Sequence, residues 1–231
     1  MHFLVLKSQR CYSSLIGMEV QKLFPKAWVH CVEDASGALR ICAKHPIQLA
    51  IVGARTEALD GLDYLPKLIA SPYPRQIVVL TERKDQRLLA FFEKHKLDGF
   101  IDANTEDPHS VNKALQKVMQ GERYRSKSLI PEIQKARRQQ SLLSETEQRV
   151  LSVLGAAVDN ATAGLLLGVS EHTARTHRNR IQNKLNIASK ADLIHYAMDN
   201  YYTRISSNRI QFPGFEEQLD RSVLPRGDPL R

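Results

Sequence analysis

The segment SEHTARTHRNRIQNKL, residues 170–185, holds the side chains of this sequence that are best suited to bind an anionic polymer. If it forms one helix, Ala174, Ile181 and Leu185 share a face and point into a core. The opposite face then displays cations, amides and a hydroxyl: His172, Arg175, Thr176, Arg178, Asn179 and Asn183. Arginine can bind phosphate or guanine, and asparagine can pair with adenine in the major groove of DNA. The pattern indicates a DNA-binding face, and a merely solvated charged face is the alternative.

Five apolar runs alternate with helical patterns in the first 120 residues. The runs are 2–7, 27–32, 48–52, 76–80 and 98–102, and helices are expected near 12–23, 35–43, 61–70, 84–95 and 108–120. This order predicts a parallel sheet covered by helices on both faces, in which ligands gather at the carboxyl ends of the strands. Those ends are Lys7, Gly53, Leu80 with Thr81, and Asp102 with Ala103.

The helix with the polar face belongs to an all-helical stretch that begins near residue 142. Ser144 and Glu147 form a capping box, which predicts a helix from Glu145. The further expected N-caps are Asn160, Ser170 and Ser189, the last with Asp192. Gly168 should end the second helix, and the short GVS turn before the third helix is typical of a helix-turn-helix.

The net charge of +8 is concentrated in the connector between these two regions. Residues 121–140 hold six Lys or Arg against two Asp or Glu, whereas residues 141–200 hold six of each. This stretch is either a solvated linker or a contact to phosphate, and Arg137 and Arg138 are the expected backbone contacts in the second case. From residue 202 onward, scattered Pro and Gly without a period predict an irregular tail.

Several classes of protein and site do not fit this composition. No apolar run reaches the ~18 to 20 residues that cross a bilayer, so we expect a cytoplasmic protein without a membrane partner. The three cysteines predict no disulfide framework. The histidines at 30, 45, 95 and 109 are dispersed, so we expect no metal site and no cofactor. The absence of a glycine-rich phosphate loop and of a nucleophile–base pair argues against an enzyme.

Residues 142–200 closely resemble the four-helix DNA-binding domain of the LuxR/NarL family of bacterial transcription regulators. The resemblance rests on LSETEQRVLSVL, the S-E-x-T at 170–173, the H-R-x-R-I at 177–181 and the closing K-L-x-I-x-S-K-A-D-L. It implies that Arg175, Thr176 and Asn179 probe the major groove. It also implies phosphate contacts for three further residues: Thr173, Arg178 and Lys184.

The second helix of this domain departs from the family pattern. The family usually has N-K-E-I-A where this sequence has Asn160, Ala161, Thr162, Ala163 and Gly164, which removes a common basic contact to the DNA backbone. Ala157 stands where the family usually has glycine. If that position is left-handed, alanine costs about 1 kcal/mol, so we expect a less stable domain.

The five βα units resemble a response-regulator receiver domain, a flavodoxin-like fold. In that family two acids after the first strand and an aspartate after the third bind Mg²⁺, and that aspartate accepts a phosphoryl group. The corresponding positions here are Lys7 and Ser8 for the acids, Gly53 for the acceptor, Thr81 for the sensing hydroxyl and Ala103 for the lysine. A hard divalent ion needs anionic oxygen ligands, so we predict a receiver-like domain that is not phosphorylated.

The sequence thus predicts a flavodoxin-like (βα)5 domain followed by an all-α four-helix LuxR-type helix-turn-helix domain. The expected boundaries are 1–121 for the receiver-like domain, 122–141 for the basic linker, 142–201 for the DNA-binding domain and 202–231 for the tail. The predicted function is phosphorylation-independent transcription regulation by a homodimer on double-stranded DNA, with a protein or small ligand as a second partner at the degenerate pocket. The alternative is a partner-sequestering interaction module that binds DNA weakly or without specificity.

Overall fold

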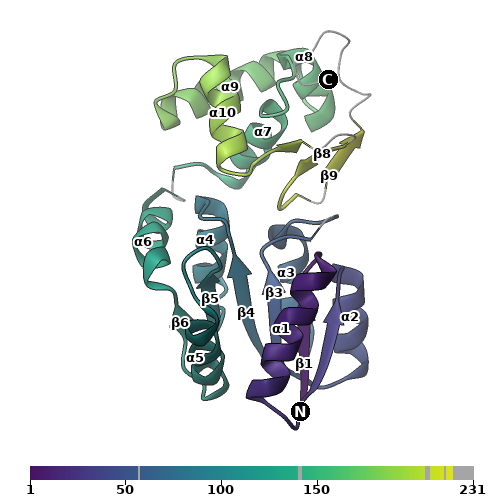
Figure 1. Cartoon of the computed structure of the whole chain (residues 1–231). Coiled ribbons are helices and arrows are strands. Elements are labelled where there is room, and N and C mark those ends of the chain that lie inside the picture. Colours follow the sequence, from purple (N-terminus) through teal and green to yellow (C-terminus); the bar gives the residue numbers. More distant parts are fainter. Residues whose placement is uncertain (57, 140–141, 206–208, 216, 221–231) are drawn as a thin grey trace. The chain divides into compact units, whose positions relative to one another are not determined.

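The computed structural model describes residues 1–56, 58–139, 142–205, 209–215 and 217–220. The chain divides into two compact units (Figure 1). The first comprises residues 1–84 and 88–135, and the second comprises residues 85–87 together with the described part of 136–231. No described helix is long and apolar enough to cross a membrane.

The first unit is a parallel α/β sandwich. Its strands are β1 (His2–Leu6), β2 (Trp28–Val32), β3 (Ile47–Gly53), β4 (Gln76–Thr81), β5 (Gly99–Asp102) and β6 (Tyr124–Arg125). Its helices are α1 (Arg10–Leu23), α2 (Ala35–Lys44), α3 (Gly61–Ala70), α4 (Gln86–Lys94) and α5 (Pro108–Met119). The strands pair in the order β2-β1-β3-β4-β5-β6, so the first five follow the flavodoxin-like order.

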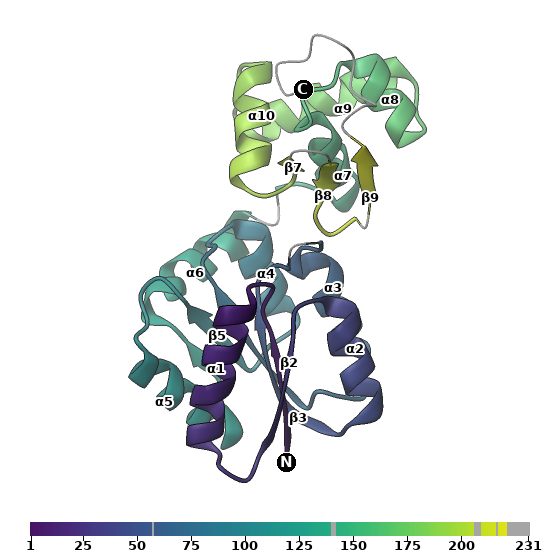
Figure 2. The ribbon, with the colours of Figure 1, turned by 45° about the vertical axis from the view of Figure 1, so that its right-hand side comes forward.

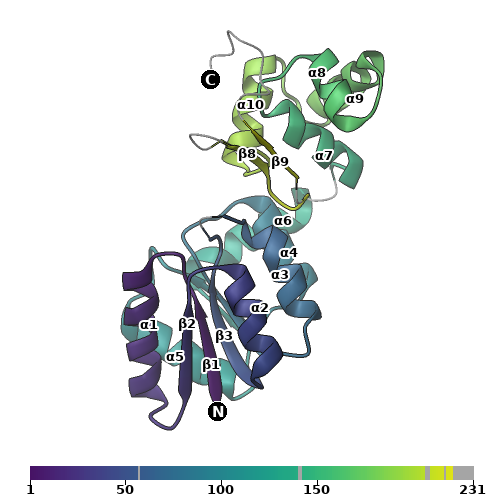
Figure 3. The ribbon, with the colours of Figure 1, turned by 90° about the vertical axis from the view of Figure 1, so that its right-hand side faces the viewer.

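Helices cover both faces of this sheet, as the alternation of strands and helices predicts. Helices α1 and α5 lie on one face, and α2, α3 and α4 lie on the other (Figure 3). Alternate side chains of β1, such as Phe3 and Val5, pack with Val20 of α1 and Leu115 of α5. Near-continuous burial of the central strands β1, β3 and β4 is what a sheet with two covered faces requires.

The stretch that the sequence predicts as a linker starts as part of the sheet. Its first residues form β6, which pairs with β5, and they are followed by a 3₁₀ turn (Lys127–Leu129) and by α6 (Ile130–Gln139). Arg125 is half-buried, and its guanidinium donates to the carbonyl oxygen of Leu97 at 2.8 Å and lies 3.3 Å from the Glu93 carboxylate. Part of the basic stretch therefore holds the sheet edge together and is not a free linker.

Four helices make up most of the second unit (Figure 2). They are α7 (Glu145–Leu154), α8 (Asn160–Leu167), α9 (Glu171–Leu185) and α10 (Lys190–Asp199). The Ser144–Glu147 capping box is present, with the Glu147 carboxylate accepting from the Ser144 amide at 2.8 Å. Ser170 and Ser189 cap α9 and α10, and Gly168 ends α8 in the left-handed conformation, as predicted.

One predicted cap is wrong. Helix α8 is capped by Asp159, whose carboxylate accepts from the Thr162 amide at 2.7 Å, and Asn160 is the first helical residue. The two neighbours are both good N-cap residues, so the sequence pattern places the boundary only to within one position.

The tail is more regular than its composition predicts. Strands β7 (Arg204–Ile205), β8 (Arg209–Phe212) and β9 (Glu217–Asp220) form an antiparallel three-stranded sheet. Ile210 and Phe212 are buried in the same core as Val150 and Leu151 of α7. The prediction of an irregular segment after residue 202 is therefore wrong for the described strands, and residues 221–231 lie outside the described part of the chain.

Candidate DNA-binding face and strand-end site

Helix α9 presents the predicted polar stripe to solvent. Ala174 and Ile181 are buried, which fixes the rotation of the helix about its axis. As a consequence His172, Arg175, Asn179 and Asn183 are exposed. These residues follow one another at steps of three or four, so they lie along one line of the helix. Long cations and amides on one exposed line can reach base edges and phosphates when the helix enters a major groove.

The two threonines of the predicted face are half-buried and hydrogen-bonded within the helix. The Thr176 hydroxyl donates to the carbonyl oxygen of His172 at 2.9 Å. The Thr173 hydroxyl lies 2.8 Å from the hydroxyl of Ser170, the N-cap of the same helix. Each hydroxyl oxygen keeps acceptor capacity, but the proton of Thr176 is already used.

Two residues that the family resemblance assigns to phosphate make contacts inside the unit. The Lys184 ammonium lies 2.7 Å from the buried Glu147 carboxylate. Arg178 is half-buried and donates to the carbonyl oxygen of Val158 at 3.2 Å. These contacts join α9 to α7 and to the loop before α8, so both cations stabilise the helical core whether or not they also meet DNA.

Arg180 is an exposed cation of α9 that the predicted face leaves out. It lies seven residues after Thr173 and four before Lys184, on a line beside the main stripe. The sequence signal was the alternation of arginines in R-N-R, which places the two cations on different sides of the helix.

The departures from the family pattern have structural counterparts. Ala157 has φ of 64°, so alanine does occupy a left-handed position as the sequence comparison anticipates. Gly164 lies where the turn of the helix-turn-helix returns to α8, and a Cβ there would come within 2.8 Å of the Val169 carbonyl oxygen. Glycine at 164 therefore permits a close approach of backbone segments, in addition to reducing the packed volume.

The predicted strand-end residues lie at the carboxyl edge of the sheet. Lys7 and Ser8 follow β1, Gly53 and Thr81 are the last residues of β3 and β4, and Ala103 follows β5. Gly53 and Thr81 are buried, and the Thr81 hydroxyl donates to the Arg83 carbonyl oxygen at 3.0 Å. The ammonium of Lys7 lies 3.3 Å from the carboxylate of Glu82. Glu57, another acid of this region, lies outside the described residues.

The buried carboxylates of Asp60 and Asp102 lie near this edge, and each has a cationic partner. Asp60 caps α3 and forms an ion pair with Arg83, with both side chains almost fully buried. Asp102, the last residue of β5, accepts from Lys84 at 2.8 Å and from the Ser128 hydroxyl at 2.7 Å. Burial acts to raise the pKa of Asp102, but the hydrogen bonds from Lys84 and Ser128 outweigh it, so the net shift is downward. Both carboxylates are thus paired with cationic groups of the protein.

A pocket of about 620 Å³ opens beside this edge, between α1 and α5. Lys7 and Ala103 are at its inner end, and its walls are mostly apolar, with Tyr12 and Ile16 from α1 and Leu115 from α5. The sequence predicts a pocket over the strand ends themselves, whereas Gly53 and Thr81 are buried and the open volume lies to one side. The structural reason is that the Lys7 side chain fills space near Gly53, where a Cβ would meet Lys7 Cδ at 3.2 Å.

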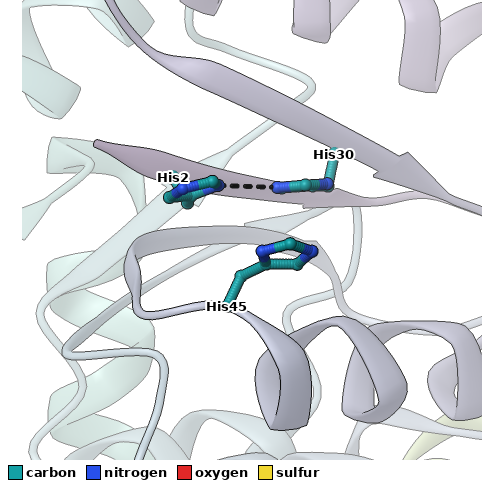
Figure 4. A group of neighbouring side chains, drawn as sticks. All are labelled: His2, His30 and His45. Atoms are coloured by element: carbon teal, nitrogen blue, oxygen red, sulfur yellow. Dashed lines mark hydrogen bonds between the residues drawn. The ribbon is translucent and has the colours of Figure 1, made fainter.

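The expectation of dispersed histidines is wrong for part of the set. His30 and His45 lie together with His2, a residue that the sequence pattern did not single out (Figure 4). The three positions are far apart in sequence, and pairing of β1 with β2 brings two of them together. His95 and His109 are not members of this cluster.

A receiver-like α/β unit joined to a helical unit with an exposed third helix defines the class of two-domain DNA-binding regulators. Residues 141–197 match the family model described as bacterial regulatory proteins, luxR family. The chain is 27% identical over 158 residues to the transcriptional regulatory protein MctR of Rhizobium johnstonii, covering 66% of this chain and 72% of that protein. It is 26% identical over 174 residues to the virulence-factor transcription regulator BvgA of Bordetella pertussis, covering 73% and 83%.

Solved structures show the same fold. The response regulator RcsB of Salmonella typhimurium aligns with a TM-score of 0.59 at 17% identity, over 86% of this chain and 99% of that one. A structure of RcsB in complex with DNA aligns with a TM-score of 0.58 at 16% identity. These matches support a DNA-binding response regulator that acts in transcription regulation, with a LuxR-type helix-turn-helix domain at residues 141–197. The predicted fold class is confirmed.

Proposed function

We propose that this regulator binds its operator as a homodimer through the outer face of α9 and that aspartyl phosphorylation is not its switch. The observation that carries the binding mode is the exposed line of Arg175, Asn179 and Asn183 on a helix whose opposite side is buried. Arginine and asparagine are the side chains that make bidentate contacts with guanine and adenine. Arg178 is half-buried and Lys184 is paired with Glu147, whereas Arg175 and Arg180 are exposed and are the cations of α9 that we assign to DNA.

The composition of the strand ends supports phosphorylation-independence. Magnesium in proteins is bound through carboxylate oxygens, and the residues after β1 are Lys7 and Ser8. The last residue of β3, Gly53, has no side chain to accept a phosphoryl group. The nearby buried acids Asp60 and Asp102 are already paired with cations. The residues present therefore do not fit a magnesium ion at the family position.

Symmetry of the binding site supports a dimer. One recognition helix covers only a few base pairs, and two placed about one DNA turn apart, ~34 Å, read a palindrome. A structure of two RcsB dimers bound to two parallel DNAs is a relative of the same fold, with a TM-score of 0.54. In this proposal the receiver-like unit supplies dimer contacts, and the pocket between α1 and α5 accepts a small ligand or a protein segment as input.

A DNA-binding experiment tests the face. Genomic DNA is captured with the intact protein, with Arg175→Ala and with Arg149→Ala, which removes an exposed arginine of α7 away from the face. We expect Arg175→Ala to lose the enriched sites and Arg149→Ala to retain them. Equal recovery by all three proteins contradicts the assigned face. Weak recovery by all three that does not depend on salt favours the interaction-module alternative.

A second measurement tests the role of the connector. If Arg137 contacts phosphate, the slope of log affinity against log salt falls by about 1 in Arg137→Ala. An unchanged slope excludes that contact. The side chain of Arg138, the other predicted contact, lies outside the described residues.

A phosphorylation assay tests the switch independently. The intact protein is incubated with acetyl phosphate and Mg²⁺, and its mass and its DNA affinity are measured. We expect no acid-labile mass increase and no change in affinity, while a receiver with its acids intact serves as the positive control. A stoichiometric phosphoryl adduct contradicts this part of the proposal and leaves the DNA-binding part intact.

A further inference from the structure

Three imidazole rings meet at the edge of the sheet, on the face that α2 covers. His2 is the first residue of β1, His30 is in the edge strand β2, and His45 caps the carboxyl end of α2. Leu4 pairs in register with His30, and side chains two residues apart share a face, so the His2 and His30 rings must project to the same side. The end of α2 then places His45 against both rings (Figure 4).

The distances between the rings are those of a potential ligand set. The Nδ1 atom of His2 lies 3.0 Å from the Nε2 atom of His30. One nitrogen from each of the three rings lies within 4.8 Å of the other two. In a tetrahedral zinc site with Zn–N bonds of about 2.0–2.1 Å, neighbouring nitrogens are separated by roughly 3.3 Å. The three rings are stacked, with centroids 4.7, 4.9 and 5.3 Å apart, so ion binding requires the rings to turn about their side-chain torsions until the three nitrogens reach that spacing.

Coordination depends on the protonation state of the rings. Neutral imidazole is the form that offers a lone pair to a metal. The hydrogen bond between His2 and His30 shows that the two rings already share one proton between facing nitrogens, and a cation can take the place of that proton.

We propose that His2, His30 and His45 form a binding site for one divalent transition-metal ion of the zinc type. Imidazole nitrogen suits Zn²⁺, Cu²⁺ and Ni²⁺ and does not suit Mg²⁺ or Ca²⁺, which need oxygen. The ion has three protein ligands, and water completes the tetrahedron because the three residues are only half-buried. The ligands come from β1, β2 and the end of α2, so the ion links the edge strand β2 and helix α2 to β1.

This site is separate from the family magnesium position. His2 is at the amino end of β1, whereas Lys7 follows the carboxyl end of the same strand. The proposal therefore does not rest on the proposed function, and a failure of either leaves the other standing.

Metal titration of the intact chain tests the site. The protein is prepared without an added tag, treated with a chelator and titrated calorimetrically with ZnCl₂, as wild type, His45→Ala and His109→Ala. His109 is an exposed histidine of the same unit outside the cluster, so it is the matched control. We expect one Zn²⁺ per chain, a loss of affinity of about 100-fold or more in His45→Ala, and wild-type affinity in His109→Ala. Equal affinity in all three proteins overturns the site.

Spectroscopy on the wild-type protein provides a test that does not depend on a variant. With Co²⁺ as the probe, we expect the visible absorption of a tetrahedral site without thiolate charge-transfer bands, because Cys31 and Cys42 are not in the cluster. In ¹⁵N-histidine spectra, Zn²⁺ should shift the imidazole signals of His2, His30 and His45. Shifts confined to histidines of the helical unit, or thiolate bands with Co²⁺, overturn the proposal even if His45→Ala does not fold.

Discussion

The outer face of α9 and the carboxyl edge of the receiver-like sheet both gather charge, but they use it in opposite ways. On α9, Arg175 and Arg180 are exposed, and the buried side of the helix consists of small and apolar residues. At the sheet edge, Arg83 and Asp60 are buried against each other, and the buried Asp102 binds Lys84. The α9 face leaves these two arginines exposed, and the sheet edge pairs its charges within the fold.

The two regions differ in whether their charged side chains are paired within the protein. A receiver edge that binds a cation must leave several carboxylates without protein partners. In this chain a protein cation lies beside the buried carboxylates of Asp60 and Asp102, and Lys7 occupies a position where the receiver resemblance leads us to expect an acid. Paired charges of this kind stabilise the fold, whereas Arg175 and Arg180 of α9 are exposed. Five substitutions test this contrast, and we expect the largest effects from changes to buried groups.

Removal of the buried arginine should have the largest effect. In Arg83→Met the Asp60 carboxylate stays buried without its ion-pair partner, so we expect the free energy of unfolding of the first unit to fall by about 3–5 kcal/mol. Urea unfolding, followed by circular dichroism, measures it. Lys84→Met is the control, because Lys84 is 39% exposed and Asp102 keeps its bond from Ser128. A loss in Arg83→Met no larger than in Lys84→Met would show that the edge charges are not structural.

The stability of the helical unit should depend on the tail strands that pack in its core. Ile210 of β8 is fully buried, so Ile210→Ala should destabilise the second unit by about 2–5 kcal/mol. Leu165→Ala is the control, since that side chain is 81% exposed, and its effect should stay within about 0.5 kcal/mol. Thermal unfolding measures both. Similar values for the two variants would mean that the tail strands do not belong to the core.

Loss of one amide from the exposed line should affect specific binding alone. Asn179→Ala removes a side chain that can pair with adenine, so we expect the affinity for operator DNA to fall by about 1–3 kcal/mol, roughly 10- to 100-fold. Affinity for random-sequence DNA, measured by fluorescence anisotropy in the same buffer, should stay nearly constant. An equal loss of affinity for both DNAs would instead assign Asn179 to a contact with the DNA backbone.

The left-handed alanine offers a gain in stability without a change of charge. Ala157 has φ of 64°, where glycine is unstrained, so Ala157→Gly should raise the free energy of unfolding of the second unit by about 1 kcal/mol. Ala156→Gly is the matched control at a neighbouring buried position with no positive φ, and it should destabilise. A loss of stability in Ala157→Gly would indicate that the left-handed turn relaxes in solution.

The smallest effect concerns the ion pair that ties α9 to α7. Burial acts to raise the pKa of Glu147, but hydrogen bonds from Lys184 and Ser144 lower it on balance below its ordinary value of 4.5. A lowered folded-state pKa stabilises the fold above the unfolded-state value and ceases to do so as the pH falls through the folded-state value. The stability difference between wild type and Glu147→Gln should therefore be present at neutral pH, at under about 1 kcal/mol, and vanish in acid.

A control separates this ion pair from the rest of the acid titration. Glu145→Gln changes an exposed acid in the first turn of the same helix. Glutamine at 147 keeps the capping box, so the comparison isolates the charge. If the two variants lose the same stability over the same pH range, the contact between Glu147 and Lys184 contributes nothing specific.

Much of the fold could be predicted because its signals are local. The capping box at Ser144 and the end of α8 at Gly168 depend on residues within one helical turn, and both predictions are confirmed. The polar stripe of α9 follows from where Ala174 and Ile181 fall in a repeat of 3.6 residues. Strand β6, at two residues, was missed because it is too short for a pattern and is defined only by its pairing with β5.

The sequence predicts a candidate site only where all its residues lie on one helix or at one strand end. The exposure of Arg175 follows from its position in α9, whereas the internal contacts of Arg178 and Lys184 depend on the loop before α8 and on α7. The cation beside Asp60 is 23 residues away in sequence. No spacing rule links two such positions, because the distance between them depends on how β3 and β4 pair and on which loop folds over their ends.

The alternation of strands and helices, the approximate helix ends and the identity of the strand-end residues follow from the sequence, since periodicity and capping act between near neighbours. Three features follow only from the tertiary structure. They are the pairing of the buried charges, the packing of the tail strands into the helical core, and the cluster of His2, His30 and His45. The physical reason is that strand register and helix packing bring distant residues within bonding distance. A metal site made by three elements therefore has no counterpart in the linear order of the chain.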